Sequence, residues 1–183
     1  MLTPEQREQL IDALGEAQRI GMLGPSNLGQ SVGQAERLAE RVPPETGDFL
    51  DVGSGGGLPG LVVALAHPGL RGLLVDRRGK RVDLLTRLVG RLGLRDRVEA
   101  VACDVADLPV RKPGMTWPVI TARGFGSPSY TLELVVPVLA PEGILLVTEP
   151  PGSAGERWVA AVGPHAMTLE AVDQGIAVLR RTR

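Results

Sequence analysis

Apolar residues along this chain occur in two patterns, as short continuous runs and as stripes of helical spacing. Short runs predict buried strands, whereas apolar residues three or four positions apart predict helices that bury one face. The chain begins with two such helices. Thr3 is the expected N-cap of the first, followed by Pro4 and by Gln6, which completes a capping box. The second helix is expected over residues 27–41, before Pro43-Pro44.

From residue 48 onwards the predicted strands and helices alternate. Strands are expected at 48–52, 72–75, 98–102, 118–122 and 144–148, and helices at 59–66, 79–91, 129–139 and 155–162, with a loop over 110–115. This alternation predicts a parallel sheet with helices on both faces. Two final strands, 167–172 and 176–179, flank a tight turn and predict an antiparallel hairpin. We expect one Rossmann-like α/β domain over 1–183, with an N-terminal helical extension (1–42) and a core (48–183).

Composition places the chain among ordinary globular proteins. Hydrophobic residues make up 43% and charged residues 22% of its 183 positions, which suits one domain with one core. A single cysteine, Cys103, and two histidines leave no basis for an internal disulfide or a zinc site, so no metal is expected. The sequence shows neither a bilayer-spanning run nor a signal peptide at its start, which predicts a cytoplasmic protein.

The net charge of −1 hides a basic segment. Residues 71–97 contain nine Lys and Arg against three acids, and Lys80, Arg87 and Arg91 share one face of the predicted helix 79–91. Such a face can bind RNA phosphates, or it can be an ordinary solvated helix surface. The sequence leaves both readings open.

The strand at 48–52 ends in a glycine-rich turn. Glycines allow a backbone to turn through conformations closed to other residues and to approach a ligand closely, and the following helix directs its free N–H groups into the turn. The spacing fits the dinucleotide pattern G-x-G-x-x-G, which is weak alone. With an acid at the strand end it becomes D-x-G-x-G-x-G, typical of methyltransferases that use S-adenosyl-L-methionine and release S-adenosyl-L-homocysteine. The candidate cofactor-binding residues here are Asp51, Gly53, Gly55 and Gly57.

Further candidates lie where the next predicted strands end, because ligands of a doubly wound sheet bind at the carboxyl ends of its strands. Asp76 is placed to bind ribose hydroxyls, although it also suits an N-cap of the next helix. Asp104 is placed to bind the adenine amino group, although aspartate at a strand end is also a common turn-former. Leu58 and Val105 are expected on the two faces of the adenine ring.

Two residues after the strand at 118–122 are the candidate catalytic residues. Arg123 can pair with a carboxylate or a phosphate, and Phe125 can stack on a base, with core packing as the alternative for Phe125. No Asp/Asn-Pro-Pro-aromatic sequence follows this strand, which argues against methylation of an exocyclic amine. An acceptor with a free lone pair, such as guanine N7, needs mainly positioning.

Three segments together resemble a known family. They are Phe49-Leu50-Asp51-Val52-Gly53-Ser54-Gly55-Gly56-Gly57-Leu58-Pro59-Gly60, Val75-Asp76 with Gly79-Lys80-Arg81, and Thr121-Ala122-Arg123-Gly124-Phe125. They are similar to the bacterial 16S rRNA guanine-N7 methyltransferases, the glucose-inhibited-division-protein-B-like family, over residues 48–148. The resemblance implies methyl transfer to rRNA of the small ribosomal subunit. It also places five residues at the cofactor: Gly53, Leu58, Val105, Ala106 and Arg123.

The chain departs from that family at several positions. Asn27-Leu28-Gly29 stands where the family has Asn-Leu-Thr, and Glu149-Pro150 replaces Lys-Gly, which is expected to remove a positive charge near the cleft. Alternatives are a methyltransferase of the same fold for another RNA or a small molecule, and a relative that binds S-adenosylmethionine without catalysis. A nicotinamide-dependent oxidoreductase is disfavoured because no Tyr-x-x-x-Lys pair is present.

Overall fold

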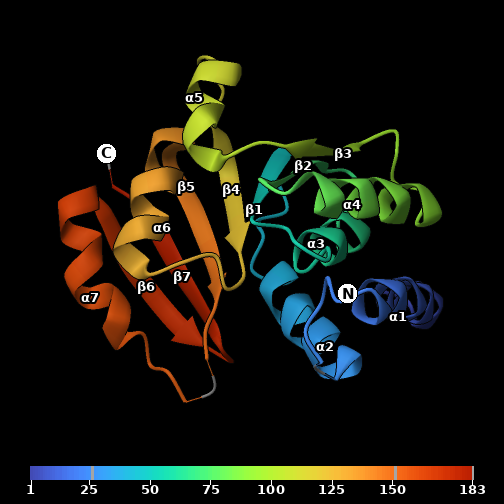
Figure 1. Ribbon diagram of the computed structural model, residues 1–183. Coiled ribbons are helices and arrows are strands. Elements are labelled where there is room, and N and C mark those ends of the chain that lie inside the picture. Colours follow the sequence, from blue (N-terminus) through green and yellow to red (C-terminus); the bar gives the residue numbers. More distant parts are fainter. Residues whose placement is uncertain (26, 151, 183) are drawn as a thin grey trace.

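The computed structural model describes residues 1–25, 27–150 and 152–182, and within them a seven-stranded sheet forms the central layer (Figure 1). Its strand order is β3-β2-β1-β4-β5-β7-β6. The strands are β1 (Asp48–Val52), β2 (Arg71–Asp76), β3 (Val98–Ala102), β4 (Trp117–Ala122), β5 (Leu139–Thr148), β6 (Met167–Asp173) and β7 (Ile176–Arg181).

Strand pairing confirms the predicted fold class. β1 pairs in parallel with β2 and β4, β2 pairs in parallel with β3, and β4 pairs in parallel with β5. β7 runs antiparallel to both β5 and β6, as expected of the closing hairpin. The hairpin turns through Gln174 and Gly175, which have φ values of 50° and 75°, the sign that a tight hairpin turn requires.

Helices cover both faces of the sheet. They are α1 (Pro4–Arg19), α2 (Leu28–Ala39), α3 (Gly60–Ala66), α4 (Gly79–Arg91), α5 (Leu108–Arg111), α6 (Pro128–Val135) and α7 (Glu156–Val162). Phe49 packs in a core cluster with α1 to α4, whereas the next residue, Leu50, packs in a second cluster with α6 and α7. Neighbouring residues of a strand point to opposite faces, so β1 is buried on both sides and reads as a continuous apolar run.

Local patterns predicted most element bounds, with two exceptions. The segment 110–115, expected as a loop, begins inside α5. The helix predicted over 129–139 was wrong at its end, because α6 stops at Val135, a 3-10 turn covers Val136–Val138, and β5 starts at Leu139 rather than at Ile144. Pro137 has no N–H to continue the helical ladder, which accounts for the early stop.

The N-terminal helices begin as their sequences predict. In the capping box of α1, Thr3 Oγ1 accepts a hydrogen bond from the Gln6 backbone N–H at 3.1 Å, and Gln6 Oε1 accepts one from Thr3 N–H at 2.9 Å. Asn27 caps α2 in the same way, through Gln30 N–H. α2 packs on α3 and reaches β5, so it borders the carboxyl edge of the parallel strands. Within the described ranges, the helices are too short or too polar to cross a membrane.

Candidate functional site

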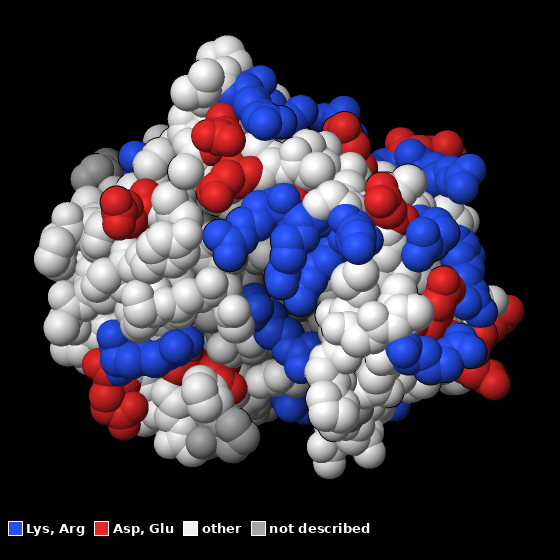
Figure 2. Space-filling model, in the orientation of Figure 1, with Lys and Arg blue, Asp and Glu red and all other residues white. Residues whose placement is uncertain are grey.

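A cavity of about 260 Å³ opens at the carboxyl edge of the parallel strands. The predicted residues that line it are Gly53, Asp76, Asp104, Val105, Arg123 and Phe125. Sequence reasoning missed others, chiefly Arg78, Arg81 and Tyr130. Figure 2 shows Lys and Arg side chains gathered over the middle of this face, where the surface is hollowed. The expectation that ligands bind at the carboxyl ends of the strands, called the strand-end rule below, therefore brings six of the predicted residues to one cavity.

The glycine turn after β1 forms a cradle at this cavity. Gly53 and Gly55 have φ values of +66° and +55°, which L side chains rarely adopt. A Cβ at Gly53 would lie 2.7 Å from the Phe125 ring, and one at Gly55 would lie 3.0 Å from the Arg81 guanidinium. Gly57 faces inward, since its Cβ would lie 2.4 Å from Leu61. The turn therefore needs glycine for its backbone and for the space beside it.

Asp76 connects the glycine turn to the start of α4. Its carboxylate is 3% exposed and accepts hydrogen bonds from the backbone N–H of Gly55 at 3.1 Å and of Arg78 at 2.9 Å. The guanidinium groups of Arg78 and Arg81 lie 3.3 and 3.6 Å from it. The N-cap of α4 is Arg78, so Asp76 is not the N-cap that the sequence allowed. Its carboxylate lies at the cavity wall, where the ribose role would place it.

Asp51 lies behind the glycine turn and does not line the cavity. Its side chain has no exposed surface; Oδ1 accepts a hydrogen bond from the Thr121 hydroxyl at 2.6 Å, and Oδ2 has no hydrogen-bond partner within the described part of the chain. A Cβ at Gly60 would lie 2.7 Å from that oxygen. Burial raises the pKa of Asp51 to about 6, and the hydrogen bond from Thr121 offsets only part of this effect.

The segment after β3 contributes two of its three predicted residues to the cavity. Asp104 lines it and also starts the 3-10 turn Val105–Asp107 by accepting a hydrogen bond from Ala106 N–H at 3.1 Å. Ala106 itself is exposed and is not among the lining residues. Leu58 lines a neighbouring hollow rather than the cavity that contains Val105. The structure therefore does not bring Leu58 and Val105 into one cavity.

Arg123 occupies the point where three hollows meet. Together with Gly124 it lines the main cavity, the hollow beside Leu58, and a larger cavity under α2. Arg123 Nη2 donates to Ser31 Oγ at 3.2 Å, and in the described ranges no carboxylate lies within salt-bridge distance of its guanidinium. Burial lowers the pKa of Arg123. A half-buried cation in this setting favours an anionic ligand.

Phe125 has an aromatic neighbour that the sequence did not reveal. Its ring lies 5.9 Å from that of Tyr130, with 28° between the planes. Phe125 also packs against the core cluster under α6, so the packing role and the cavity-lining role coexist. The chain has only five aromatic residues, and Tyr130 lies five positions after Phe125. The same scarcity that drew attention to Phe125 could therefore have pointed to Tyr130 as a second candidate.

Two arginines of the basic face predicted on α4 form ion pairs with α1. Arg91 pairs with Asp12 and lies 3.7 Å from Glu16, and Arg87 lies 4.0 Å from Glu16. Both side chains stay about half exposed, so Lys80, Arg87 and Arg91 as an RNA-contact face stay a prediction, although sequence periodicity could not show that α1 supplies acids there. The cations that surround the cavity are Arg77, Arg78, Arg81 and Arg123.

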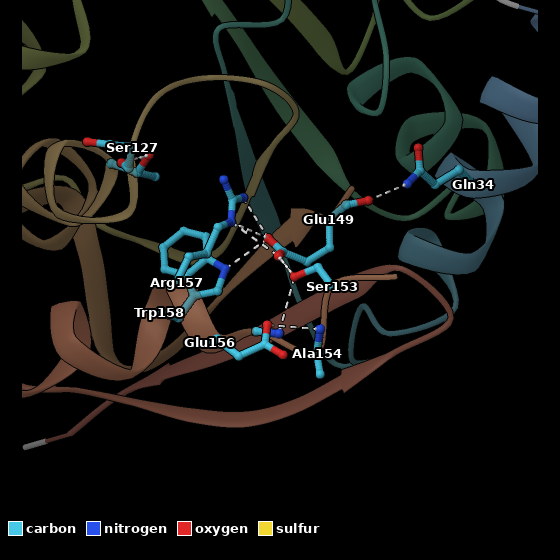
Figure 3. A network of polar contacts seen from close by, with 10 residues as sticks. Gln34, Ser127, Glu149, Ser153, Ala154, Glu156, Arg157 and Trp158 are labelled. Carbon is cyan, nitrogen blue, oxygen red and sulfur yellow. Dashed lines mark hydrogen bonds and ion pairs between the residues drawn. The ribbon is translucent and has the colours of Figure 1, made fainter. Parts of the chain in front are cut away.

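The larger cavity, of about 600 Å³, lies between α2 and the loop after β5. At its wall the side chain of Glu149, with no exposed surface, accepts hydrogen bonds from Arg157, from Ser153 Oγ at 2.6 Å and from Trp158 Nε1 at 2.9 Å (Figure 3). Burial would raise the pKa of Glu149, but these hydrogen bonds outweigh it and hold the pKa below its usual value. Arg157 therefore neutralises the acid at position 149 and keeps an arginine at the cavity wall.

Comparisons with known proteins agree with this geometry. The family model described as rRNA small subunit methyltransferase G matches residues 27–156. "Ribosomal RNA small subunit methyltransferase G" of Acidothermus cellulolyticus is 35% identical over 69% of this chain and 55% of its own length. The protein of the same name from Erythrobacter litoralis is 38% identical over 71% of this chain and 63% of its own length.

The solved structure of cofactor-bound Rv0187 from MTB superimposes with a TM-score of 0.76 over 96% of this chain and 91% of that one. Its sequence is 16% identical, so this likeness concerns the fold alone. The chain spans between about two fifths and two thirds of the length of the curated relatives it matches. Because the family model covers residues 27–156, with the glycine turn and the whole cavity edge, the chain belongs to the rRNA small subunit methyltransferase G family.

Proposed function

We propose that this chain is an S-adenosylmethionine-dependent methyltransferase that methylates guanine N7 in 16S rRNA. The observation that carries the proposal is the glycine cradle at the end of β1, where Gly53 and Gly55 have positive φ and a Cβ would meet the cavity-lining side chains of Phe125 and Arg81. Backbone that has no side chain leaves room for a ligand held by N–H groups. The names of the relatives supply the substrate class.

The residues around the cavity fit the parts of S-adenosylmethionine. Gly53 and Gly55 would face its methionine part, Asp76 its ribose, and Asp104 and Val105 its adenine. The side chain of Arg78 is 55% exposed and its Nε lies 3.3 Å from Asp76, so it is the contact that can give way to a ribose hydroxyl. When bound, the cofactor supplies an electrophilic methyl group on a sulfonium centre.

Arg123 would bind an anionic group of the cofactor, because it is half-buried and its guanidinium donates to the neutral Ser31 hydroxyl. Asp51 and Gly57 lie behind the turn, and we assign them the role of holding its shape. Leu58 and Ala106 stay predictions as cofactor contacts. Since α2 brings Ser31 to Arg123, we also propose that residues 1–42 and 48–183 act as one methyltransferase domain.

Guanine N7 carries a free lone pair, so the reaction needs no base to remove a proton before transfer. The task of the protein is then to bind both reactants in line, and positioning alone can contribute about 7–11 kcal/mol to a barrier. The stacked pair of Phe125 and Tyr130 offers an aromatic surface for the acceptor base.

Two measurements test the proposal. Calorimetry should show binding of S-adenosylmethionine and S-adenosylhomocysteine but not of NAD. Incubation of small ribosomal subunits with tritiated S-adenosylmethionine should label 16S rRNA at a guanine that becomes sensitive to cleavage at N7-methylguanine. Binding without label on any RNA would indicate a non-catalytic relative, and binding of NAD alone would refute the methyltransferase assignment.

A glycine variant ties the activity to the cradle. Gly55→Asp adds a side chain beside Asp76 and should weaken S-adenosylmethionine binding by more than about 100-fold through steric conflict and charge repulsion. Gly69→Asp is the matched control, because a Cβ at the exposed Gly69 would meet open space. Circular dichroism verifies that both variants fold. Near-normal affinity of a folded Gly55→Asp protein would show that the turn is not the binding site.

A further inference from the structure

The cavity under α2 adjoins the proposed cofactor cavity and shares Arg123, Gly124 and Phe125 with it. Its volume of about 600 Å³ lies within the roughly 300–1,000 Å³ typical of small-ligand sites. A molecule bound there would lie against the same Phe125 ring that faces the other cavity. The two cavities are therefore arranged as neighbouring sites for two reactants.

The charges at this second cavity favour an anion. Arg37, Arg123 and Arg157 line it, and the one acidic residue among the lining residues that the structure describes is Glu149. The carboxylate of Glu149 is engaged by Arg157, Ser153 and Trp158, and Figure 3 shows it turned into that cluster. Arg37 donates through Nε to the Gln174 carbonyl at 3.3 Å and so contacts no carboxylate there. Three cations against one acid give this wall a net positive charge, and one positive charge remains for a second ligand once Arg123 binds the cofactor.

Gln34 adds a fixed hydrogen-bond acceptor. Its Nε2 donates to the Glu149 backbone carbonyl at 3.3 Å, and Figure 3 shows its Oε1 directed away from that carbonyl. An amide whose nitrogen is committed in this way presents its oxygen to donors. The same contact joins α2 to the loop after β5, so this wall of the cavity is held from both sides.

We propose that this cavity binds the acceptor nucleotide, with Arg37 and Arg157 at its phosphate and Gln34 Oε1 accepting a hydrogen bond from the N2 amine of guanine. The assignment rests on the proposed methyltransferase function. N7 and the N2 amine lie on opposite edges of guanine, so contact of the amine edge with Gln34 on α2 turns N7 toward the side that Arg123 and Phe125 share with the cofactor cavity. Enzymes that modify bases commonly hold a flipped base in this manner, by its edge and by stacking.

The first experiment compares Arg37→Gln with Arg41→Gln. Both arginines lie at the C-terminal end of α2 and donate to carbonyls of the β6–β7 turn, but Arg41 pairs with Asp173 and is not among the cavity-lining residues. With small ribosomal subunits as substrate, Arg37→Gln should raise KM about 10-fold or more and flatten the salt dependence of binding by about one phosphate contact. Its affinity for S-adenosylmethionine should stay unchanged, and Arg41→Gln should match the wild type.

The second experiment tests Gln34 with free nucleotides, and therefore does not depend on turnover. The protein saturated with S-adenosylhomocysteine is titrated with GMP and with IMP, which lacks the N2 amine. Wild type should bind GMP more tightly than IMP, by about 10-fold for one hydrogen bond to a half-buried acceptor, and Gln34→Met should abolish the preference. Equal affinities in wild type, or an unchanged preference in the variant, would overturn the assignment of Gln34.

The two proposals fail in different ways. A wild-type protein that neither binds S-adenosylmethionine nor labels RNA contradicts the proposed function. If wild type labels rRNA while Arg37→Gln keeps its KM and its salt dependence, the methyltransferase proposal stands and the acceptor cavity is refuted. Arg37→Lys should recover part of the lost affinity, since the lysine keeps the charge but not the planar guanidinium.

Discussion

The buried carboxyl group of Asp51 allows a quantitative test of how the glycine turn is supported. The side chain has no exposed surface and shares one hydrogen bond with Thr121, and burial raises its pKa from 3.8 to about 6. In Asp51→Asn the amide keeps an oxygen for the Thr121 hydroxyl but cannot ionise. The variant therefore removes one titration and leaves the rest of the chain unchanged.

The sign and size of the effect follow from proton linkage. Between about pH 4 and pH 6 the folded protein keeps a proton that the unfolded chain releases, so the ionisation of Asp51 costs folding free energy as the pH rises. A rise of about two pKa units corresponds to about 3 kcal/mol at 1.36 kcal/mol per unit, reached once the pH exceeds the folded value. About 0.5 kcal/mol of this is already lost at pH 4, so the stability of Asp51→Asn relative to wild type should increase by about 2.5 kcal/mol from pH 4 to pH 8.

Urea unfolding followed by circular dichroism at several pH values measures this difference. The variant also changes the free energy of unfolding by an amount that does not depend on pH, for example through an unpaired amide N–H. This contribution cancels, because only the change of the free-energy difference with pH is compared. Asp48→Asn is the matched control: it lies on the same strand, its side chain is 44% exposed, and its pair with Arg71 should contribute less than about 1 kcal/mol. If the difference between Asp51→Asn and wild type stays flat across this pH range, the carboxyl group is not held as the structure indicates.

Two further predictions concern packing and the buried ion pair. Gly60→Ala should lower the free energy of unfolding by about 1–3 kcal/mol, because its Cβ would lie 2.7 Å from the Asp51 carboxylate, whereas Gly69→Ala should change it by less than about 0.5 kcal/mol in the same urea assay. In a double-mutant cycle, Glu149→Leu and Arg157→Leu should show a coupling of about 1–3 kcal/mol, and additive effects would contradict the bidentate pair. Since the pKa of Glu149 is lowered in the folded protein, this coupling should be present above the unfolded pKa and fade as the pH falls through the folded value.

Sequence patterns were sufficient where local physics decides the structure. The bounds of β1, α4 and β3 are those predicted, because β1 is a buried apolar run between turn residues and α4 carries one apolar stripe that ends at Arg91. The strand-end rule depends on topology alone, so it placed Asp76, Asp104 and Arg123 at one cavity without any knowledge of side-chain contacts.

Contacts between residues distant in the sequence were beyond those patterns. Asp51 on β1 meets Thr121 on the neighbouring strand β4, a contact behind the turn on which its proposed role as a support rests. Arg91 meets Asp12 because α1 packs on α4, which pairs one arginine of the predicted basic face. Neither contact leaves a periodic signal, since each depends on how two separately predictable elements are placed against one another.

Position 149 shows why the charge near a site cannot be inferred from a single substituted residue. Glu149 in place of the family's lysine suggests a cleft that has lost a cation, yet its carboxylate is buried, and a buried carboxylate requires a partner. That partner, Arg157, lies one short loop later at the wall of the same cavity. Nε and Nη2 of Arg157 face Glu149, and among the residues that the structure describes its Nη1 makes no hydrogen bond that would keep it from a ligand. The acid therefore fixes the position of an arginine, and the cavity keeps a donor that the substitution seemed to delete.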